Sequence, residues 1–155
     1  MANSTHQAAT FPLRAPGTVE EWERYYELRW QRLRAPWDQP RGSEKDDRET
    51  EGVHLAVWDD SGAPVAVGRL HLNSPAEAQV RFMAADPDWE RLGLGSRILQ
   101  ELEARARQLG ATTVVLNSRD QAQAFYRRHG YEATGEAGTL FGEVLHVRMT
   151  KKLSA

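Results

Sequence analysis

The chain has 155 residues, 40% of them hydrophobic, so it is long enough for one domain with one core and too short for two. Its 20 basic and 22 acidic residues give a formal net charge of -2, which argues against a nucleic-acid partner and a polybasic membrane anchor. Because cysteine is absent, disulfides, thiolate metal sites and a cysteine nucleophile are excluded, and any thiol chemistry must come from a ligand.

The first ten residues lack the basic start and apolar core of a signal peptide, and no apolar run approaches the ~20 residues of a membrane span. We therefore expect a cytoplasmic protein without membrane contact, with a flexible tail over residues 1–10 and one domain over residues 11–153. Residues 11–15 form a candidate first strand.

A helix is predicted over residues 19–33. Thr18 and Glu21 form a capping box, and apolar residues follow at helical spacing. Most of the aromatic side chains in this region are expected in the core. Tyr25, Trp30 and Trp37 are also candidates for lining the mouth of a pocket.

Residues 34–52 have no periodicity and contain two prolines and a charged run. We interpret them as a long loop with one helical turn, and as a mobile flap beside the substrate site, because loops of this length in compact domains are commonly functional. Asp46, Asp47 and the carboxylates of the preceding helix are candidates for attracting a cationic acceptor.

Residues 53–58 and 64–72 flank a turn and predict an antiparallel hairpin, which a third strand over residues 78–85 follows. Gly93 and Gly95 then stand at the start of an amphipathic helix. Such a turn can bind a phosphate, because the first amides of a helix lack intrahelical partners and glycine lets the backbone come close.

The amphipathic helix ends at Gly110, and its polar face carries the i,i+4 pairs Glu101–Arg105 and Glu103–Arg107.

Residues 112–116 are expected to form a buried strand parallel to residues 78–85, which makes a right-handed βαβ unit. The glycine turn then lies at the carboxyl end of the first strand, where open α/β sheets bind ligands. A helix over residues 120–128 and a hairpin of residues 131–136 and 140–149, turning at Ala137-Gly138, complete the predicted α/β chain.

Two motifs and the order of the elements resemble the GNAT superfamily of N-acetyltransferases. The family motif Gln/Arg-x-x-Gly-x-Gly/Ala is matched at Gly93 and Gly95, with Glu90 in its first position. The family motif Asn-x-x-Ala-x-x-Phe-Tyr-x-x-x-Gly-Phe/Tyr has Arg119 in its first position, and its matching residues are Ala122, Phe125, Tyr126, Gly130 and Tyr131.

The resemblance covers roughly residues 11–153 in element order. It implies a single-domain GNAT fold, with a central mixed sheet, a splayed pair of parallel strands and flanking helices, and an acyltransferase that uses acetyl-CoA. Residues 81–83 and 141–153 are also similar to the ElaA-like group of small bacterial GNAT proteins.

The resemblance further implies the binding site for acetyl-CoA. It assigns the backbone amide of Met83, on a bulge of the strand before the glycine turn, to the thioester oxygen, and Ala85 to the pantetheine arm. Tyr126 would hydrogen-bond the CoA sulfur and protonate it as a general acid. The pyrophosphate would contact the turn, namely Arg91, Leu92, Gly93, Leu94, Gly95 and Ser96.

The departures from the motifs affect two contacts. Because Glu90 stands where the family has glutamine or arginine, one contact beside the pyrophosphate is expected to be lost. Arg91 and Arg97 are expected to face the phosphates. Arg119 puts a side-chain contact in doubt, and Asn117 is a candidate replacement.

An acceptor ammonium group must lose a proton before it attacks, which requires a base or a water relay. We take His146 as the candidate base, with His71 and Glu143 as alternatives. The spacing of histidines and carboxylates matches no metal site, so no metal is expected.

We therefore expect direct transfer of an acetyl group from acetyl-CoA to a primary amine of a small molecule or peptide. The alternative is a noncatalytic module of the same fold that binds acyl-CoA, and the presence of Tyr126 favours the enzyme. The acceptor and the oligomeric state are left open, with a homodimer among the candidates.

Overall fold

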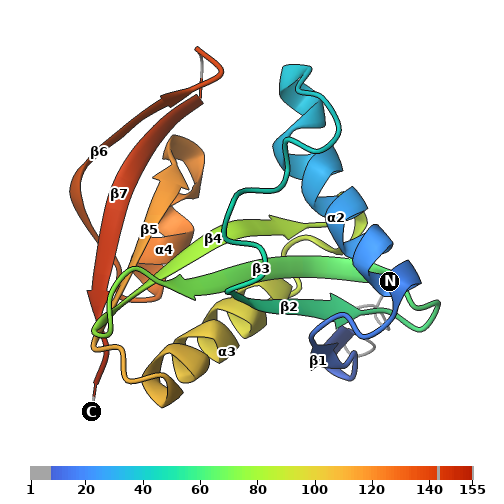
Figure 1. Cartoon of the computed structure of the whole chain (residues 1–155), viewed down its shortest axis with the longest axis horizontal. Helices are drawn as coiled ribbons and strands as arrows, with labels where there is room; N and C mark the ends of the chain where they lie inside the picture. The colour runs from blue at the N-terminus through green and yellow to red at the C-terminus, as the bar shows by residue number, and fades with distance from the viewer. Residues whose placement is uncertain (1–7, 143, 155) are drawn as a thin grey trace. The chain divides into compact units, whose positions relative to one another are not determined.

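The computed structural model describes residues 8–142 and 144–154. Its strands form a seven-stranded mixed sheet in the order β1-β2-β3-β4-β5-β7-β6. The elements, shown in Figure 1, are β1 (Leu13–Arg14), α2 (Val19–Leu33), η1 (Ala35–Trp37), β2 (Val53–Trp58), β3 (Pro64–Leu72), β4 (Glu77–Ala85), η2 (Pro87–Trp89), α3 (Leu94–Gln108), β5 (Thr113–Arg119), η3 (Asp120–Ala122), α4 (Gln123–Arg128), β6 (Glu132–Leu140) and β7 (Val144–Lys152). Among the described residues, no helix is long and apolar enough to cross a membrane.

Contacts divide the chain into two compact units. The first unit comprises the described residues up to Arg69 together with Phe82–Leu102, and the second comprises Leu70–Arg81 together with the described residues from Glu103 onward. The division passes through β3, β4 and α3, so these three elements contribute residues to both units.

Helix α2 has the bounds predicted from the sequence, because its N-terminus is capped locally. The Glu21 amide donates to Thr18 Oγ1 at 3.1 Å, and the Glu21 carboxylate accepts a hydrogen bond from the Gly17 amide at 2.8 Å. Tyr25 and Leu28 bury the inner face of the helix in a cluster that also contains Ala56, Trp58 and Val67. Tyr25 is fully buried and does not line a pocket mouth, which corrects that expectation.

The hairpin of β2 and β3 also has the predicted bounds, and its turn is fixed by Asp59, which accepts hydrogen bonds from the amides of Ser61 and Ala63. Gly68 of β3 lies against helix α3. A Cβ at this position would lie 2.7 Å from Ile98 Cγ2 and 2.7 Å from Met83 Sδ, so the close approach of α3 requires glycine here.

In the second unit, β4 and β5 pair in parallel, as predicted, over Glu77–Val80 and Thr113–Leu116. Strand β5 is longer than expected and stays paired with β7 as far as Arg119. Glu103 does not lie on an exposed polar face with Arg107. It is buried and accepts hydrogen bonds from Tyr131 Oη at 2.8 Å and Lys151 Nζ at 2.9 Å.

Three further parts of the fold differ from the predictions. The terminal hairpin turns after Leu140 and not at Ala137-Gly138, because Ala137-Gly138 lies inside β6, where the register shifts before Gly138, which has a φ of 90°. The first strand is shortened to Leu13–Arg14. The predicted helix over 120–128 divides into η3 and α4, with Ala122 at the junction.

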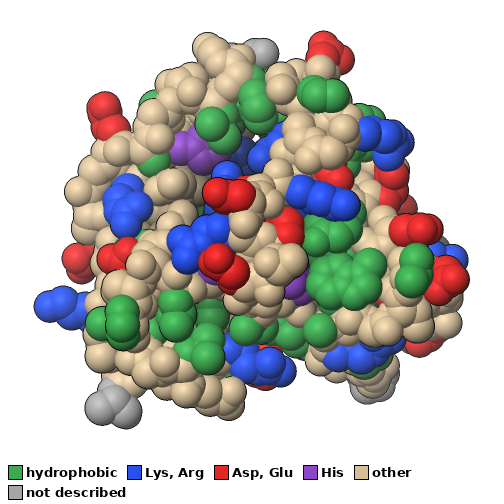
Figure 2. All heavy atoms as spheres, viewed as in Figure 1, with side chains coloured by type: hydrophobic (Ala, Val, Ile, Leu, Met, Phe, Trp, Pro, Cys, Tyr) green, Lys and Arg blue, Asp and Glu red, His purple; other side chains and the backbone are tan. Residues whose placement is uncertain are grey.

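Acidic and basic side chains are interspersed over the face shown in Figure 2, in keeping with the net charge of -2.

Candidate active site

The glycine turn joins β4 to helix α3 in the first unit. Two of its residues have left-handed backbones, Arg91 at a φ of 66° and Gly93 at a φ of 79°. A Cβ built on Gly93 would have nothing within 4 Å, so the backbone here borders open space. Helix α3 begins at Leu94, and its first-turn amides are the donors that a helix leaves for an anion. The turn therefore fits a phosphate group.

Two charged residues near the turn are held by the protein itself. Glu90, which replaces the family's polar residue, accepts a hydrogen bond from Arg32 of α2 at 2.7 Å. Arg97 was expected to face the phosphates, but its guanidinium donates to the carbonyl oxygens of Ala8 and Phe11 at 3.2 and 2.8 Å. Arg97 thus ties α3 to the start of the described chain, while Arg91 stays exposed.

Strand β4 contains the backbone irregularity that was expected before the turn. Phe82 has a φ of 59°, in the left-handed region that a bulky side chain rarely adopts. The paired register with β5 ends two residues earlier, at Val80, although β4 continues to Ala85. A residue of this conformation inside a strand is typical of a bulge.

Three guanidinium groups surround the ring of Phe82. Their central carbons lie 4.2 Å (Arg29), 5.0 Å (Arg69) and 5.6 Å (Arg34) from the ring centroid. A left-handed backbone at a non-glycine residue costs about 1–3 kcal/mol. A cation–π contact between desolvated groups contributes about 2 kcal/mol, so the guanidinium contacts are large enough to offset this strain.

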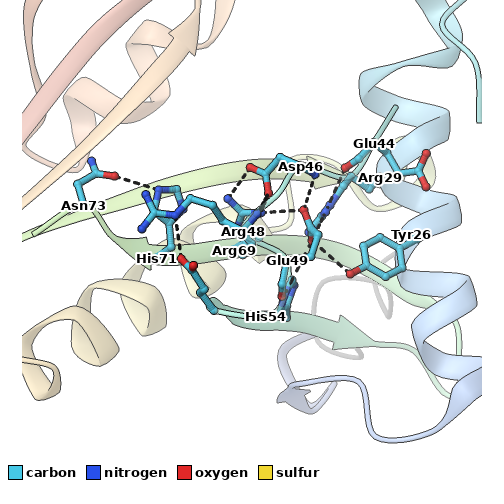
Figure 3. A network of polar contacts seen from close by, with 12 residues as sticks. Tyr26, Arg29, Glu44, Asp46, Arg48, Glu49, His54, Arg69, His71 and Asn73 are labelled. Carbon is cyan, nitrogen blue, oxygen red and sulfur yellow. Dashed lines mark hydrogen bonds and ion pairs between the residues drawn. The ribbon is translucent and has the colours of Figure 1, made fainter. Parts of the chain in front are cut away.

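The side chains of Arg29 and Arg69 are completely buried, and two carboxylates of the loop before β2 neutralise them (Figure 3). Glu49 bridges the pair, since its Oε1 lies 2.8 Å from Arg29 Nη1 and its Oε2 lies 2.7 Å from Arg69 Nη1. Besides its bond to Glu49, Arg69 donates a hydrogen bond from Nη2 to Asp46 Oδ2, at 2.8 Å. Burial opposes ionisation of Asp46, but the hydrogen bonds from Arg69 and from the Arg48 amide hold the pKa of this carboxyl well below its usual range.

The loop over residues 34–52 is therefore anchored to β3 by the ion pairs of Asp46 and Glu49 with Arg69. It contains the expected single helical turn, η1. Asp46 is committed to Arg69 and does not serve to attract an acceptor, which corrects that expectation.

His54 and two tyrosines complete this network. His54 Nε2 lies 2.7 Å from the Glu49 carbonyl oxygen, which can only accept, so Nε2 carries the proton and Nδ1 accepts from Tyr25 Oη at 2.9 Å. Burial lowers the pKa of His54, which favours this neutral form. Tyr26 Oη donates to Glu49 Oε1 at 3.2 Å.

A pocket of about 410 Å³ lies beside α2. Its aromatic walls are covered by cations of the chain itself, because Arg41 lies 4.0 Å from the ring centroid of Trp30 and Lys45 lies 4.3 Å from that of Tyr26. Trp30 thus lines a pocket, as expected. Acidic residues complete the lining, namely Glu23, Glu27 and Glu44. Aromatic faces beside carboxylates suit an organic cation.

In the second unit, Tyr126 lies on α4 and is buried, with its ring 5.9 Å from that of Tyr131. Burial raises the pKa of Tyr126 to about 12, while the charge of Arg119 acts in the opposite direction. The phenol is therefore protonated at neutral pH and is able to donate.

The remaining candidates of the second unit lie on β3, β5 and β7. Asn117 is exposed on β5, and His146 of β7 lies opposite Arg119 of β5. His146 Nδ1 lies 2.9 Å from the Val144 carbonyl oxygen, so Nδ1 carries the proton in the neutral ring and Nε2 keeps its lone pair. His71 is buried with its Nε2 3.0 Å from Asn73 Oδ1, which is typical of a structural histidine.

Glu143, the third candidate base, lies outside the described residues. Across residues 8–142 and 144–154, no group of three or more histidine or carboxylate side chains could hold a metal ion.

The cluster around Phe82 was missed by the sequence reasoning. The sequence does contain one signal for this cluster, because Arg69 is a charged residue in the middle of an apolar run. A strand of this kind is buried, and a buried arginine requires carboxylate partners. The acidic run over residues 44–51 was the available source. The left-handed conformation of Phe82 had no signal in the sequence.

Comparisons with known proteins agree with this fold. The profile of the Acetyltransferase (GNAT) family matches residues 22–131. The uncharacterized N-acetyltransferase YjcF of Bacillus subtilis (strain 168) is 30% identical over 112 residues, which cover 72% of this chain and 79% of that protein.

Two solved structures share the fold at low sequence identity. An aminoglycoside 6'-N-acetyltransferase complexed with coenzyme A has a TM-score of 0.77 at 13% identity, covering 93% of this chain and 98% of its own. Escherichia coli ElaA has a TM-score of 0.76 at 16% identity, covering 92% and 98%.

Proposed function

Because the chain belongs to the GNAT family of acetyltransferases, we propose that it transfers an acetyl group from acetyl-CoA directly to a primary amine of a small molecule or peptide. The observation that carries the proposal is the glycine turn, whose left-handed Arg91 and Gly93 border open space at the start of α3. A cytoplasmic location is a further proposal, which rests on the sequence alone, and the oligomeric state is left open, with a homodimer among the candidates.

The donor site that we propose uses the backbone of the first unit. The first-turn amides of α3 and the turn before it, over residues 91–96, would hold the pyrophosphate. Met83 would donate its amide hydrogen to the acetyl oxygen, and Ala85 would pair with the pantetheine arm. Asn117 of β5 is proposed as a side-chain contact in place of the asparagine of the family motif.

Bound acetyl-CoA supplies an activated acetyl thioester. As the amine nitrogen bonds to the acetyl carbon and the carbon–sulfur bond breaks, negative charge appears first on the acetyl oxygen and then on sulfur. The Met83 amide would stabilise the first charge. Tyr126 would give its proton to the sulfur, since its pKa of about 12 keeps the phenol protonated at neutral pH.

The acceptor enters as an ammonium ion and has to lose two protons in the course of forming an amide. We propose that His146 accepts one of them at Nε2, because its Nδ1 proton is engaged by the Val144 carbonyl. The other replaces the proton that Tyr126 gives to the sulfur, so that CoA leaves as the thiol and Tyr126 is restored. The pocket beside α2 is a candidate site for an amine acceptor, whose cationic group would take the place that Arg41 holds over Trp30 or that Lys45 holds over Tyr26.

The test is an assay of CoA release from acetyl-CoA with a panel of polyamines, amino acids, aminoglycosides and peptide amines, with N-acetyl products identified by mass. Amine-dependent release supports the proposal. Tight CoA binding without turnover on any amine would favour a noncatalytic binding module, and absence of CoA binding would contradict the donor site.

A further inference from the structure

The peptide plane between Phe82 and Met83 carries the amide that the proposed reaction uses. Its orientation depends on the backbone of Phe82, because the Met83 N–H belongs to the peptide unit that follows Phe82. Phe82 has a φ of 59°, whereas an aromatic residue in a strand normally has an extended backbone. Something in the structure must hold this residue in the left-handed region.

The contacts of the ring provide that restraint. Phe82 is 8% exposed, and its ring lies beneath Arg29 of α2 and Arg69 of β3, at 4.2 and 5.0 Å from their central guanidinium carbons. Both arginines are completely buried and are fixed by charged hydrogen bonds. If the backbone of Phe82 became extended, the ring would leave this position and the two guanidinium groups would lose their aromatic partner.

The two arginines are held in turn by Asp46 and Glu49. Glu49 binds both guanidinium groups, and Asp46 binds Arg69 through both of its oxygens. The buried cluster therefore pairs two cations with two anions. Neutralising Glu49 removes a carboxylate that fixes both arginines over the ring.

We infer that Phe82 is a positioning residue, whose ring, clamped by Arg29 and Arg69, fixes the bulge of β4 and aims the Met83 amide at the acetyl oxygen of the donor. The inference rests on the proposed function, since it needs a bound acetyl-CoA. It adds a specific requirement, namely that the hydrogen bond to the acetyl oxygen depends on an aromatic ring at position 82 and on the carboxylate of Glu49.

The experiment compares the binding of acetyl-CoA with that of S-ethyl-CoA, a thioether of the same size that lacks the acetyl oxygen. The ratio of their dissociation constants, measured by calorimetry on the full chain, isolates the carbonyl contact and needs no acceptor. A neutral hydrogen bond corresponds to a ratio of about 2 to 13, so we expect the wild-type protein to bind acetyl-CoA about fivefold more tightly.

Phe82→Leu is expected to bring the ratio to about one, while the dissociation constant of S-ethyl-CoA changes less than about twofold. Phe82→Gly removes the ring and also the backbone strain, because glycine adopts a positive φ freely. Since no ring then fixes the backbone at this position, we expect a reduced ratio in this variant as well. Glu49→Gln should also lower the ratio, because it removes the carboxylate that binds both Arg29 and Arg69. The matched control is Glu51→Gln, which removes an exposed ion pair with Arg48 from the same loop and should leave the ratio unchanged.

The outcomes separate the inference from the proposed function. If the wild-type protein binds neither ligand, the donor site itself is wrong and the inference fails with it. If the wild-type protein prefers acetyl-CoA and the Phe82 variants keep that preference, or lose affinity for both ligands equally, the positioning role is overturned while the donor site stands. Should Phe82→Leu fail to fold, an unchanged ratio in Phe82→Gly and Glu49→Gln would overturn it equally.

Discussion

The Arg32 guanidinium donates a hydrogen bond from Nη2 to Glu90 Oε1 at 2.7 Å, which joins the last turn of α2 to the residue just before the glycine turn. This ion pair offsets a negative charge that would otherwise repel a pyrophosphate bound at the turn. Both side chains are partly exposed, at 34% and 47%, so the interaction is screened by solvent.

Opposite effects on CoA binding are expected when the two partners of this ion pair are changed separately. Glu90→Gln should tighten CoA binding about two- to threefold at low salt, and Arg32→Ala should weaken it by a similar factor. Both effects should diminish at high salt, as measured by calorimetric titration. Glu21→Gln, which removes an ion pair at the other end of α2, is the control. Changes of the same sign in both variants would contradict this role for Arg32 and Glu90.

Replacing Gly93 by valine is expected to weaken CoA binding by at least tenfold while leaving a folded protein. The positive φ of 79° strains any β-branched residue by about 1–3 kcal/mol, and the new side chain would occupy the open space where the phosphates approach. Gly62→Val is a matched control, because Gly62 has a φ of 83° in the turn between β2 and β3. It should cost similar stability in thermal unfolding and leave CoA affinity unchanged. Equal affinities of both variants for CoA would remove the phosphate role of the turn.

Removing the phenol hydroxyl in Tyr126→Phe should lower kcat by about 100-fold with a dissociation constant for CoA within about twofold of wild type, as expected for a general acid. Since burial raises the pKa of Tyr126 to about 12, its ionisation should produce no fall in the wild-type rate below about pH 10. Steady-state kinetics over this pH range and CoA titration provide the two measurements. An unchanged kcat, or a loss of CoA binding equal to the loss of kcat, would count against this assignment.

The stability of the fold is expected to fall as the pH drops through about 6.5, in part because of His54. Burial lowers the pKa of His54 in the folded state, so below about pH 6.5 the unfolded chain binds a proton that the folded chain does not. Protonation therefore favours unfolding. Burial also lowers the pKa of His129, which adds a contribution of the same sign.

Urea unfolding at pH 7.5 and at pH 5.5 tests this expectation, with His54→Gln as the variant. The loss of unfolding free energy between the two pH values should be smaller in the variant than in the wild type, and the remaining loss should include the His129 contribution. A proton NMR titration in which His54 shows a pKa above 6.5 in the folded protein would contradict the argument.

Local signals in the sequence were sufficient for most elements of the fold. The bounds of α2 follow from the capping box of Thr18 and Glu21, and those of β2 and β3 from a turn that Asp59 fixes through nearby amides. The glycine turn was found for the same reason, because Gly93 and Leu94 are adjacent in the chain and their roles depend on local backbone geometry.

Side-chain pairings between residues far apart in the sequence were not found. The ion pairs of Arg69 involve residues 20 and 23 positions away, and no periodicity encodes that pairing. Glu103 was expected on a polar face because of its spacing to Arg107. It is instead buried with hydrogen bonds from Tyr131 and Lys151, which lie 28 and 48 positions away in the sequence. The terminal turn was misplaced because glycine is compatible both with a turn and with the bulge that Gly138 forms in β6.

The loop over residues 38–52 has no helix or strand, yet it supplies both carboxylates that neutralise the buried Arg29 and Arg69. Detaching this loop while α2 stays packed on β3 would leave two uncompensated charges in the interior, at a cost of several kcal/mol. Partial opening of the loop is therefore suppressed, and proteases should reach it only when the surrounding packing is lost. Its rate of cleavage should follow the free energy of global unfolding, so that limited proteolysis of this irregular loop reports on the stability of the packed core.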